Sequence, residues 1–258
     1  MAGGKTTQRI DKMLGHLGYG SRAELKKMAK QGRITLNGNV IKDTGTQADP
    51  DQDRIEVDGE LVLYREHIYL LMHKPAGVIS ATEDTREKTV IDLLPESYRV
   101  FSPFPVGRLD KDTEGLLLLT NDGALAHELL SPRKHVPKTY EADVIGEIGP
   151  YEIQRFAEGV TLDDGYITKP AKLQVLSIQE TGVQVTSRIS LTITEGKFHQ
   201  VKRMFESVGS KVLYLKRTAM GPLRLEDSLA KGSYRELTEE ELKLLSGYSP
   251  GTAAEDKP

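Results

Sequence analysis

The segment Val106–Gly115 holds the densest group of side chains that could do chemistry. It places Asp110, Asp112 and Glu114 at alternate positions, beginning two residues after Arg108, and it lies between two apolar runs. This pattern is typical of a polar loop between two strands. Three interpretations are open for the loop: a solvated charged turn, a calcium-binding loop, or the carboxylate cluster of a metal-dependent nuclease.

The calcium interpretation fails in the second half of the motif. Acids at loop positions 1, 3 and 5 and a glycine at position 6 agree with it. The next five residues are Leu, Leu, Leu, Leu and Thr, and Asn121 stands where the closing bidentate Glu is required. We therefore predict no calcium site.

Other enzyme signatures also fail. The pair His127-Glu128 lacks the second His of a zinc metalloprotease helix, and no G-x-S-x-G motif is present. The pair Gly196-Lys197 lacks both the preceding glycine-rich loop and the following Ser/Thr of a P-loop. The sequence therefore predicts neither a metal nor a cofactor.

A second candidate region runs from Ile193 to Arg217, where six Lys/Arg residues accompany two acids. Helical spacing from His199 would place Lys202 and Arg203 on roughly the face of that histidine. The remaining apolar positions are candidates for the core: Val201, Met204 and Phe205. The region is either a solvated helix face or part of a surface that binds a polyanion.

The N-terminal segment is basic as well. Residues 5–42 hold nine Lys/Arg against two acids, whereas residues 43–60 hold one against seven. The two basic regions are more than 130 residues apart in a chain whose formal net charge is −3. This segregation favours a polyanionic partner.

The elements that must position these residues differ between the two parts of the chain. Residues 8–17 have helical apolar spacing, Ser21 and Glu24 form a capping box, and Asn37-Gly38 marks a hairpin. From residue 68 onward, runs of both kinds follow without regular strand–helix alternation. We predict an α+β fold, with a small N-terminal α/β domain and a larger domain on a mixed, largely antiparallel sheet with flanking helices. The strand-like runs are 68–72, 100–109, 116–120, 139–145, 171–175, 184–194 and 211–215, and the helical ones are 124–130, 150–158, 199–207 and 239–245.

Composition limits the class of protein. The 258 residues are 38% hydrophobic and 28% charged, as in ordinary globular proteins. The longest apolar runs, such as Leu116–Leu119, are far shorter than the roughly 18 residues of a spanning helix, and the N-terminus lacks a secretory signal. The absence of cysteine fits a reducing compartment. We expect a cytoplasmic protein with no membrane partner and, without a sustained heptad pattern, a monomer.

The motifs resemble those of two families. Residues 8–60 resemble the ribosomal-protein-S-four-type RNA-binding domain, through Arg9-Ile10-Asp11-Lys12, Ser21-Arg22 and Asn37-Gly38. Residues 68–245 resemble the catalytic domain of the RsuA family of rRNA pseudouridine synthases. The motifs that carry this second resemblance are Lys74-Pro75-Ala76-Gly77, Gly107-Arg108-Leu109-Asp110, Lys138-Thr139-Tyr140, Glu195 to Met204, and Leu215-Lys216-Arg217.

The resemblance implies a domain organisation. We expect a flexible N-terminus at 1–7, the RNA-binding domain at 8–62, a linker at 63–67, the catalytic domain at 68–246 and a flexible tail at 247–258. The basic helices of the first domain would hold folded rRNA through phosphate and shape contacts. The residues expected to bind RNA are Arg9, Lys12, Ser21, Arg22, Lys26, Lys27, Arg33, Lys197 and Arg203.

The resemblance also implies the reaction. An enzyme of this kind breaks the N-glycosidic bond of a uridine, turns the uracil and rejoins it through carbon 5, without a cofactor. Asp110 would be the catalytic carboxylate, acting as a nucleophile or as a base and electrostatic partner. Tyr140 would stack on the extracted uracil, Lys202 would pair with Asp110, and Leu215 would form an apolar wall. Arg108 would hold a phosphate or fill the space that the base leaves.

The form of two motifs predicts the substrate. Glu195 to Met204 and Lys138-Thr139-Tyr140 look closer to the small-subunit type of the family. This favours uridine 516 of 16S rRNA, in free RNA or in a small-subunit assembly intermediate. A 23S rRNA pseudouridine synthase and a non-catalytic rRNA-binding assembly factor are the alternatives.

Overall fold

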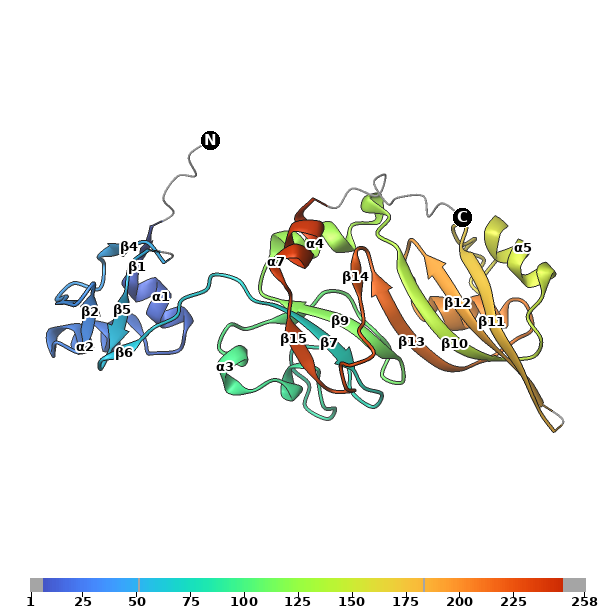
Figure 1. Cartoon of the computed structure of the whole chain (residues 1–258), viewed down its shortest axis with the longest axis horizontal. Coiled ribbons are helices and arrows are strands. Elements are labelled where there is room, and N and C mark those ends of the chain that lie inside the picture. Colours follow the sequence, from blue (N-terminus) through green and yellow to red (C-terminus); the bar gives the residue numbers. More distant parts are fainter. Residues whose placement is uncertain (1–6, 51, 183, 248–258) are drawn as a thin grey trace. The chain divides into compact units, whose positions relative to one another are not determined.

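The computed structural model describes residues 7–50, 52–182 and 184–247, which divide into two compact units. The first unit contains the described residues up to Ile68 together with 95–102, and the second contains 69–94 and the described residues from 103 onward (Figure 1). The predicted flexible ends, 1–7 and 247–258, lie outside the described residues except for Thr7 and Gly247.

The first unit combines helices with short strands. The predicted capping box is confirmed at the start of α2 (Arg22–Lys30), where the Glu24 amide donates to the Ser21 hydroxyl and the Ser21 amide donates to the Glu24 carboxylate at 2.7 Å. Strands β2 (Ile34–Leu36) and β3 (Asn39–Val40) form the hairpin predicted at Asn37-Gly38. The other elements are β1 (Gln8–Arg9), α1 (Ile10–His16), β4 (Gln47–Ala48), β5 (Ile55–Val57), β6 (Glu60–Leu61) and α3 (Glu96–Arg99).

The core of this unit lies between the helices and the sheet β3-β2-β5-β6. Buried Ile10 and Leu14 of α1 pack in one cluster with Leu25 of α2 and Ile55 of β5. Tyr64, which belongs to the predicted linker, donates a hydrogen bond of 2.9 Å to Gln8 Oε1. Part of the predicted linker therefore packs against the first unit.

The second unit is built on one mixed sheet. Its strands are β7 (Tyr69–Lys74), β8 (Phe104–Pro105), β9 (Glu114–Thr120), β10 (Lys138–Ile145), β11 (Lys172–Thr181), β12 (Gln184–Ile193), β13 (Val212–Met220), β14 (Leu223–Arg224) and β15 (Tyr234–Glu236). The order is β11-β12-β10-β13-β9-β7-β15, with β14 beside β13 and β8 beside β9. Among these described strands only β13 and β9 pair in parallel. The predicted α+β class and the mixed, largely antiparallel sheet are confirmed (Figure 1).

The strand β9 is buried on both faces of the sheet. Its residues Leu116–Leu119 are all fully buried, as a continuous apolar run predicts for a strand covered on both sides. Ala126 and Leu129 of α4 (Gly123–Leu130) and Leu245 of α7 (Glu239–Ser246) share a core cluster with Leu116.

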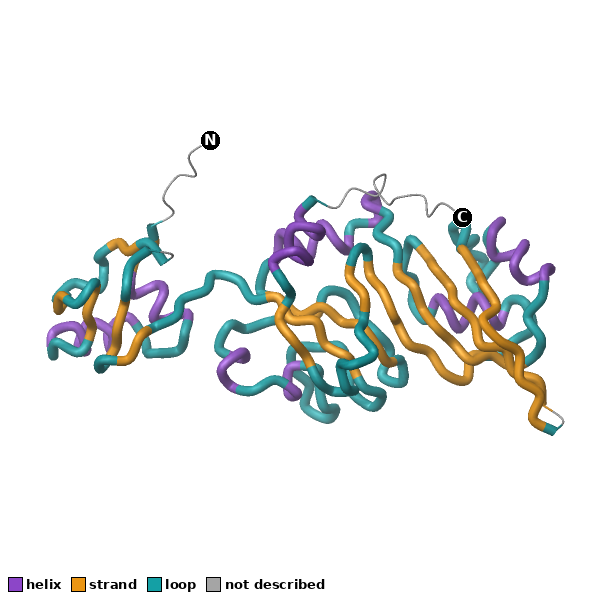
Figure 2. Tube along the Cα trace, in the orientation of Figure 1, coloured by secondary structure: helices purple, strands orange, loops and turns teal. Residues whose placement is uncertain are grey.

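The helices of this unit are η1 (Ile91–Leu93), α4 (Gly123–Leu130), η2 (Pro132–Lys134), α5 (Pro150–Glu158), α6 (Gln200–Glu206) and α7 (Glu239–Ser246) (Figure 2). None of the helices in the described residues of the chain is long and apolar enough to cross a membrane.

The prediction of a strand at residues 100–109 is wrong. The strand that pairs with β9 contains just Phe104 and Pro105, followed by one further hydrogen bond from the Val106 amide to the Leu118 carbonyl at 2.8 Å. Val100 and Phe101 belong to the turn that follows α3. Proline at 103 and 105 removes two of the amides that a ladder needs. Apolar side chains of this segment are buried although they belong to a loop, and Val106, for example, is fully buried.

Candidate active site

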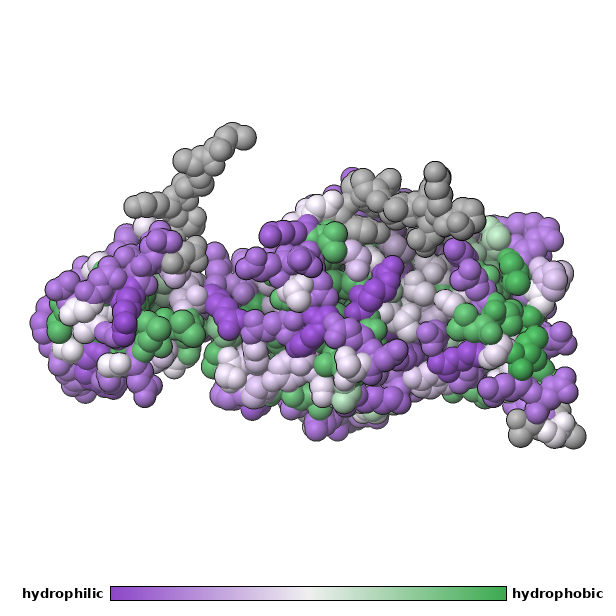
Figure 3. Space-filling view, viewed as in Figure 1, coloured by the Kyte–Doolittle hydropathy of each residue, from purple (hydrophilic) through white to green (hydrophobic). Residues whose placement is uncertain are grey.

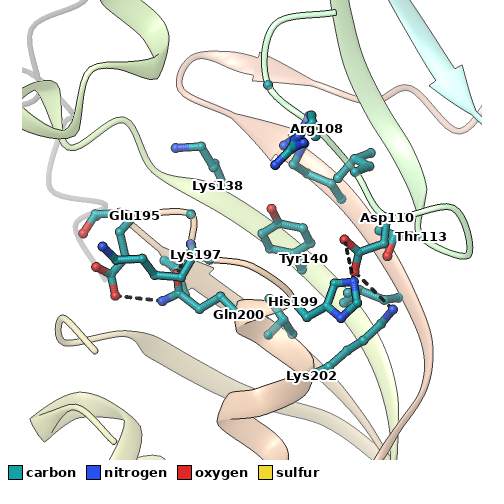
Figure 4. A pocket seen from close by; sticks show the side chains of 18 of the residues that line it. Arg108, Asp110, Thr113, Lys138, Tyr140, Glu195, Lys197, His199, Gln200 and Lys202 are labelled. Carbon is teal, nitrogen blue, oxygen red and sulfur yellow. Dashed lines mark hydrogen bonds and ion pairs between the residues drawn. The ribbon is translucent and has the colours of Figure 1, made fainter. Parts of the chain in front are cut away.

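A cavity of about 310 Å³ lies where the loop before β9 faces β10, β13 and the start of α6. A cavity of this volume is within the usual range for binding a small ligand. Residues as far apart as Gly107 and Arg217 line it, and they include Asp110, Tyr140 and Lys202 (Figure 4). The fold therefore brings together the motifs that the sequence singled out.

Two side chains anchor the loop on either side of Asp110. The Ser80 hydroxyl accepts a hydrogen bond from the Leu109 amide and donates one to the Leu109 carbonyl, both at 3.0 Å. Lys74 Nζ donates to the carbonyls of Lys111 at 3.3 Å and Thr113 at 2.8 Å. These bonds fix the backbone that carries Asp110, because buried backbone groups lose free energy when they are left unpaired.

Lys74 is a fully buried cation whose nitrogen contacts backbone carbonyls. Burial lowers the pKa of Lys74 to about 8, although the nearby carboxylates of Asp112, Asp110 and Glu114 favour its charged form. The sequence motif Lys74-Pro75-Ala76-Gly77 includes this residue but indicates no role for it. Its hydrogen bonds show that it supports the loop that carries Asp110.

Asp110 faces two nitrogen atoms from the start of α6. Lys202 Nζ lies 3.1 Å from Asp110 Oδ2, and His199 Nε2 lies 3.6 Å from Asp110 Oδ1 (Figure 4). Lys202 Nζ also contacts Asp112 at 2.7 Å. Burial acts against the charge of Lys202, but its hydrogen bonds to Asp112 and Asp110 leave its pKa above the ordinary value. Lys202 thus joins two carboxylates of the loop to α6.

Arg203, the next residue, points elsewhere. Its guanidinium pairs with Asp163 and contacts Asp164 at 2.7 Å. The sequence spacing left open which of the two basic residues, Lys202 or Arg203, lies beside Asp110. The structure places Lys202 there. The core residues predicted for this helix are buried: Val201, Met204 and Phe205.

Tyr140 and Leu215 form apolar surface inside the cavity. Both are buried, Tyr140 on β10 and Leu215 on the adjacent β13, where Ala142 pairs with Leu215. Figure 4 shows the Tyr140 ring between Asp110 on one side and Lys197 and Gln200 on the other. A flat ring at this place can stack on a base whose sugar lies near Asp110.

The parallel contact between β9 and β13 joins the two halves of the cavity. Gly115 pairs with Arg217, and a Cβ added to Gly115 would collide with the Arg217 carbonyl oxygen. Gly115 also has a φ of +111°, which L side chains rarely adopt. The close approach therefore requires glycine, and it sets how near the Asp110 loop comes to β13.

Two further cations line the cavity. Arg108 is exposed, and Lys138 donates to the Val136 carbonyl at 3.0 Å. Burial, together with the nearby charge of Arg217, lowers the pKa of Lys138 to about 8. The motif Lys138-Thr139-Tyr140 indicates no role for Lys138, yet strand periodicity places it on the same face as Tyr140.

A network of hydrogen bonds holds the loop that precedes α6. The Glu195 carboxylate accepts from Tyr166 Oη at 2.6 Å, from the Lys169 amide at 3.0 Å and from Gln200 Nε2 at 2.8 Å. The hydrogen bond to Glu195 raises the pKa of Tyr166. Lys197 Nζ lies 4.4 Å from the centre of the Tyr166 ring. This network positions Lys197 and His199 at the cavity.

The predicted RNA-binding residues of the first unit have different surroundings. Arg9 pairs with Asp11 at 2.6 Å. Arg33 contacts Asp58 at 2.5 Å, and the Ser21 hydroxyl caps α2. The others are exposed on α1 and α2: Lys12, Arg22, Lys26 and Lys27.

The carboxylates near Asp110 face cations. Asp112 pairs with Lys202, and Glu114 contacts Lys231 at 2.8 Å and Tyr214 Oη at 2.8 Å. Within residues 7–50, 52–182 and 184–247, no three His, Cys, Asp or Glu residues are grouped so that they could hold a metal ion. The acids that suggested calcium or a nuclease are therefore committed to ion pairs within the protein.

Comparison with known proteins agrees with this geometry. Residues 68–207 match the model of the RNA pseudouridylate synthase family, and residues 8–55 match the S4 domain. The chain is 55% identical to the uncharacterized RNA pseudouridine synthase YtzG of Bacillus subtilis (strain 168), over 92% of this chain and 98% of that protein.

Two further relatives differ in the ribosomal subunit that they are named for. Ribosomal large subunit pseudouridine synthase B of Bacillus subtilis (strain 168) is 42% identical, with 92% of this chain and 95% of that protein covered. Ribosomal small subunit pseudouridine synthase A of Yersinia pestis is 39% identical, with 91% and 96% covered.

A solved structure shares the fold. A crystal structure of a pseudouridylate synthase superposes with a TM-score of 0.63 at 33% identity, and the match covers 92% of this chain and 99% of that one. The expected S4-type domain and the expected enzyme class are both confirmed. The chain is a member of the RNA pseudouridylate synthase family, an isomerase that acts on RNA and carries an N-terminal S4 domain.

Proposed function

We propose that this enzyme converts uridine 516 of 16S ribosomal RNA to pseudouridine, with Asp110 as its catalytic carboxylate. The observation that carries the proposal is the position of Asp110: its carboxylate lies at the cavity, 3.1 Å from Lys202 Nζ and beside the buried ring of Tyr140. This arrangement offers an anionic group to the sugar and a flat surface to the base.

The reaction conserves all atoms of the nucleotide. The bond from C1′ to N1 breaks, the uracil turns, and a bond from C1′ to C5 forms, while C5 loses a proton and N1 gains one. Asp110 serves as a nucleophile at the sugar or as a base and electrostatic partner. Tyr140 and Leu215 confine the uracil while it is detached, and Lys202 orients the carboxylate. The loss of one base from the RNA stack costs a few kcal/mol, which Arg108 offsets by contacting a phosphate or by filling the gap.

The target within ribosomal RNA is supported by motif form. Glu195 to Met204 and Lys138-Thr139-Tyr140 favour the small-subunit type. A relative named for the small subunit is 39% identical to this chain. A relative named for the large subunit is 42% identical, and this observation makes a uridine of 23S rRNA the second candidate.

The test is a pseudouridine map of both ribosomal RNAs after incubation with purified protein. Free transcripts and small-subunit assembly intermediates serve as substrates. Asp110→Asn, which keeps the shape and removes the charge, should lower the rate at least about a hundredfold. Asp227→Asn, at an exposed acid that does not line the cavity, is the matched control.

Each outcome has a distinct meaning. A single Asp110-dependent site at uridine 516 supports the proposal, whereas a site in 23S rRNA keeps the chemistry and changes the target. Tight binding without new pseudouridine in any substrate would favour the non-catalytic assembly factor.

A further inference from the structure

Phe198 is the most exposed large apolar side chain of the described residues, with 72% of its surface accessible. It lies in the loop that leads into α6, one residue before His199 and four before Lys202. Exposure of an aromatic ring loses the free energy that burial would supply, about 25 cal/mol for each Å² of apolar surface. A ring in this position gains that free energy only when something covers it.

The ring already has one face covered. It stacks on His199, with ring centroids 3.8 Å apart and an angle of 20° between the planes. The exposed surface therefore belongs to the edges and to the opposite face. His199 Nε2 in turn lies 3.6 Å from Asp110 Oδ1, so the stack begins beside the loop that carries Asp110 (Figure 4).

The backbone is held so that the stack persists. His199 has left-handed backbone angles, with φ of 47° and ψ of 33°, a conformation that non-glycine residues rarely adopt. The Phe198 carbonyl accepts a hydrogen bond of 3.3 Å from Arg203 Nη1, and Asp163 and Asp164 fix that guanidinium. On the other side, the Lys197 amide donates to Gln200 Oε1 at 2.8 Å. The pair of rings is thus preorganised.

We propose that Phe198, supported by His199, is a stacking surface for an RNA base that neighbours the target uridine. The inference rests on the proposed function, because it needs an RNA strand whose target nucleotide reaches Asp110. Tyr140 then stacks on the extracted uracil inside the cavity, while Phe198 stacks on a neighbouring base outside it. The two contacts select a strand with one base turned inward and the next one stacked outside.

The surroundings favour an RNA base over an apolar protein side chain. The exposed cation Lys197 precedes the ring, and exposed Arg108 lines the adjacent cavity. Surfaces that bind single-stranded RNA combine aromatic rings for the bases with cations for the phosphates, and both kinds of side chain occur here. The stack accepts any base, because each has a flat face, so it determines the position of the strand more than its sequence.

The first experiment compares wild type, Phe198→Ala and Phe198→Tyr in single-turnover pseudouridine formation over a range of rRNA concentrations. Loss of one base–aromatic stack should raise the RNA concentration for half-maximal rate about tenfold and leave the saturating rate within about twofold. Phe198→Tyr keeps a flat ring and should match wild type. Tyr151→Ala removes another exposed aromatic residue, on α5 and outside the cavity, and is the matched control.

A second measurement is independent of the reaction. The same proteins are titrated into a fluorescent twelve-nucleotide single-stranded RNA and into a copy whose bases are replaced by abasic sites. Phe198→Ala should weaken binding of the first RNA about tenfold relative to Tyr151→Ala and leave binding of the abasic copy unchanged. Equal affinities of the Phe198→Ala and Tyr151→Ala proteins for the first RNA would overturn the inference. Absence of pseudouridine with wild type would instead overturn the proposed function, and the binding data would still decide on Phe198.

Discussion

Charges of both signs line the cavity, and they are distributed unevenly. Asp110 and Asp112 meet at Lys202, whose single positive charge offsets one of the two carboxylate charges. Arg108 and Lys138 also line the cavity, and no carboxylate among the described residues forms a salt bridge with either of them. We infer that the cavity is arranged to receive an anionic strand past these two cations, with its sugar toward the carboxylate.

Lys138 gives this distribution a dependence on pH. Its pKa of about 8 means that the side chain is charged at pH 7 and mostly neutral at pH 9. We expect kcat/KM for rRNA to fall severalfold from pH 7 to pH 9, since this ratio reports the free enzyme. Lys138→Arg keeps its charge from pH 7 to pH 9, so its kcat/KM should fall much less over this range. Parallel pH profiles for the two proteins would show that the charge of Lys138 does not matter.

At the scale of elements, the site depends on how closely β9 and β13 approach. Their parallel contact places Gly115 against the backbone of Arg217, and the loop with Asp110 ends where β9 begins. The cavity is lined by residues of β10 and β13, which are antiparallel neighbours with many paired residues. The short parallel contact therefore couples the loop that carries Asp110 to these two strands.

Substitution of Gly115 tests this dependence. Gly115→Ala adds a Cβ that would collide with the Arg217 carbonyl oxygen, so one of the two strands must move. Gly146→Ala is the control, because Gly146 also has a positive φ, +93°, but open space around its Cβ position. Both substitutions force an alanine into a backbone conformation that favours glycine. Urea unfolding should nevertheless show Gly115→Ala to be at least about 2 kcal/mol less stable than Gly146→Ala, because only Gly115→Ala adds a collision. Equal stability would mean that the strands separate without cost.

Lys74 gives the Asp110 loop a measurable signature. Its pKa is about 8 in the folded protein and 10.5 for an ordinary lysine, so between these values the unfolded chain binds more protons. The free energy of unfolding therefore rises as pH increases through this window. Lys74→Met keeps the apolar stem and should show a rise from pH 8 to pH 9.5 that is about 1 to 2 kcal/mol smaller than that of wild type. Identical rises in urea unfolding would refute the burial of this charge.

Local signals in the sequence were sufficient for most elements. The capping box at Ser21 and the helix after His199 are visible because their signals lie within a few neighbouring residues. Strand β11 extends to Thr181, beyond the expected end at 175, because a bulge between Val175 and Ser177 interrupts the alternation that marks a strand.

The site was predictable only as far as its motifs. Asp110, Tyr140 and Lys202 were named from the sequence, and the structure brings them to one cavity. The anchoring of the loop by Ser80 and Lys74 depends on hydrogen bonds to backbone atoms distant in sequence, which leave no pattern. The stacked ring of Phe198 was missed for a different reason: a single aromatic residue before a helix does not indicate whether its ring is buried or exposed.

At the scale of the molecule, the charges that could bind RNA lie on both units. The first unit exposes Lys26 and Lys27 on α2, and the second carries Lys197 at the cavity. On the second unit, the face drawn in Figure 3 is mostly hydrophilic, with apolar residues gathered near the β11 end of the sheet. Leu176 and Ile178 of β11 are among the exposed apolar residues. Basic groups on each of the two units suit a large RNA substrate.

The salt dependence of binding measures the share of the first unit. Lys26→Gln with Lys27→Gln should reduce the slope of log Kd against log salt by about 0.7 to 0.9 for each phosphate that the protein no longer neutralises. Lys172→Gln with Lys243→Gln removes the same charge from exposed positions of the second unit that do not line the cavity, and it should leave the slope unchanged. Equal effects of the two pairs would argue against a specific role of α2 in RNA binding.

The assembly of the cavity from distant segments has a consequence for synthesis. Asp110 leaves the ribosome about a hundred residues before Leu215 and Arg217, a delay of roughly 5 to 20 seconds at bacterial elongation rates. Throughout that interval α1, α2 and their strands are complete, whereas Asp110 still lacks Lys202 and the wall of β13. A nascent chain can therefore bind RNA with its S4 domain before it has any pocket for a uridine, so recognition precedes chemistry during the synthesis of the enzyme itself.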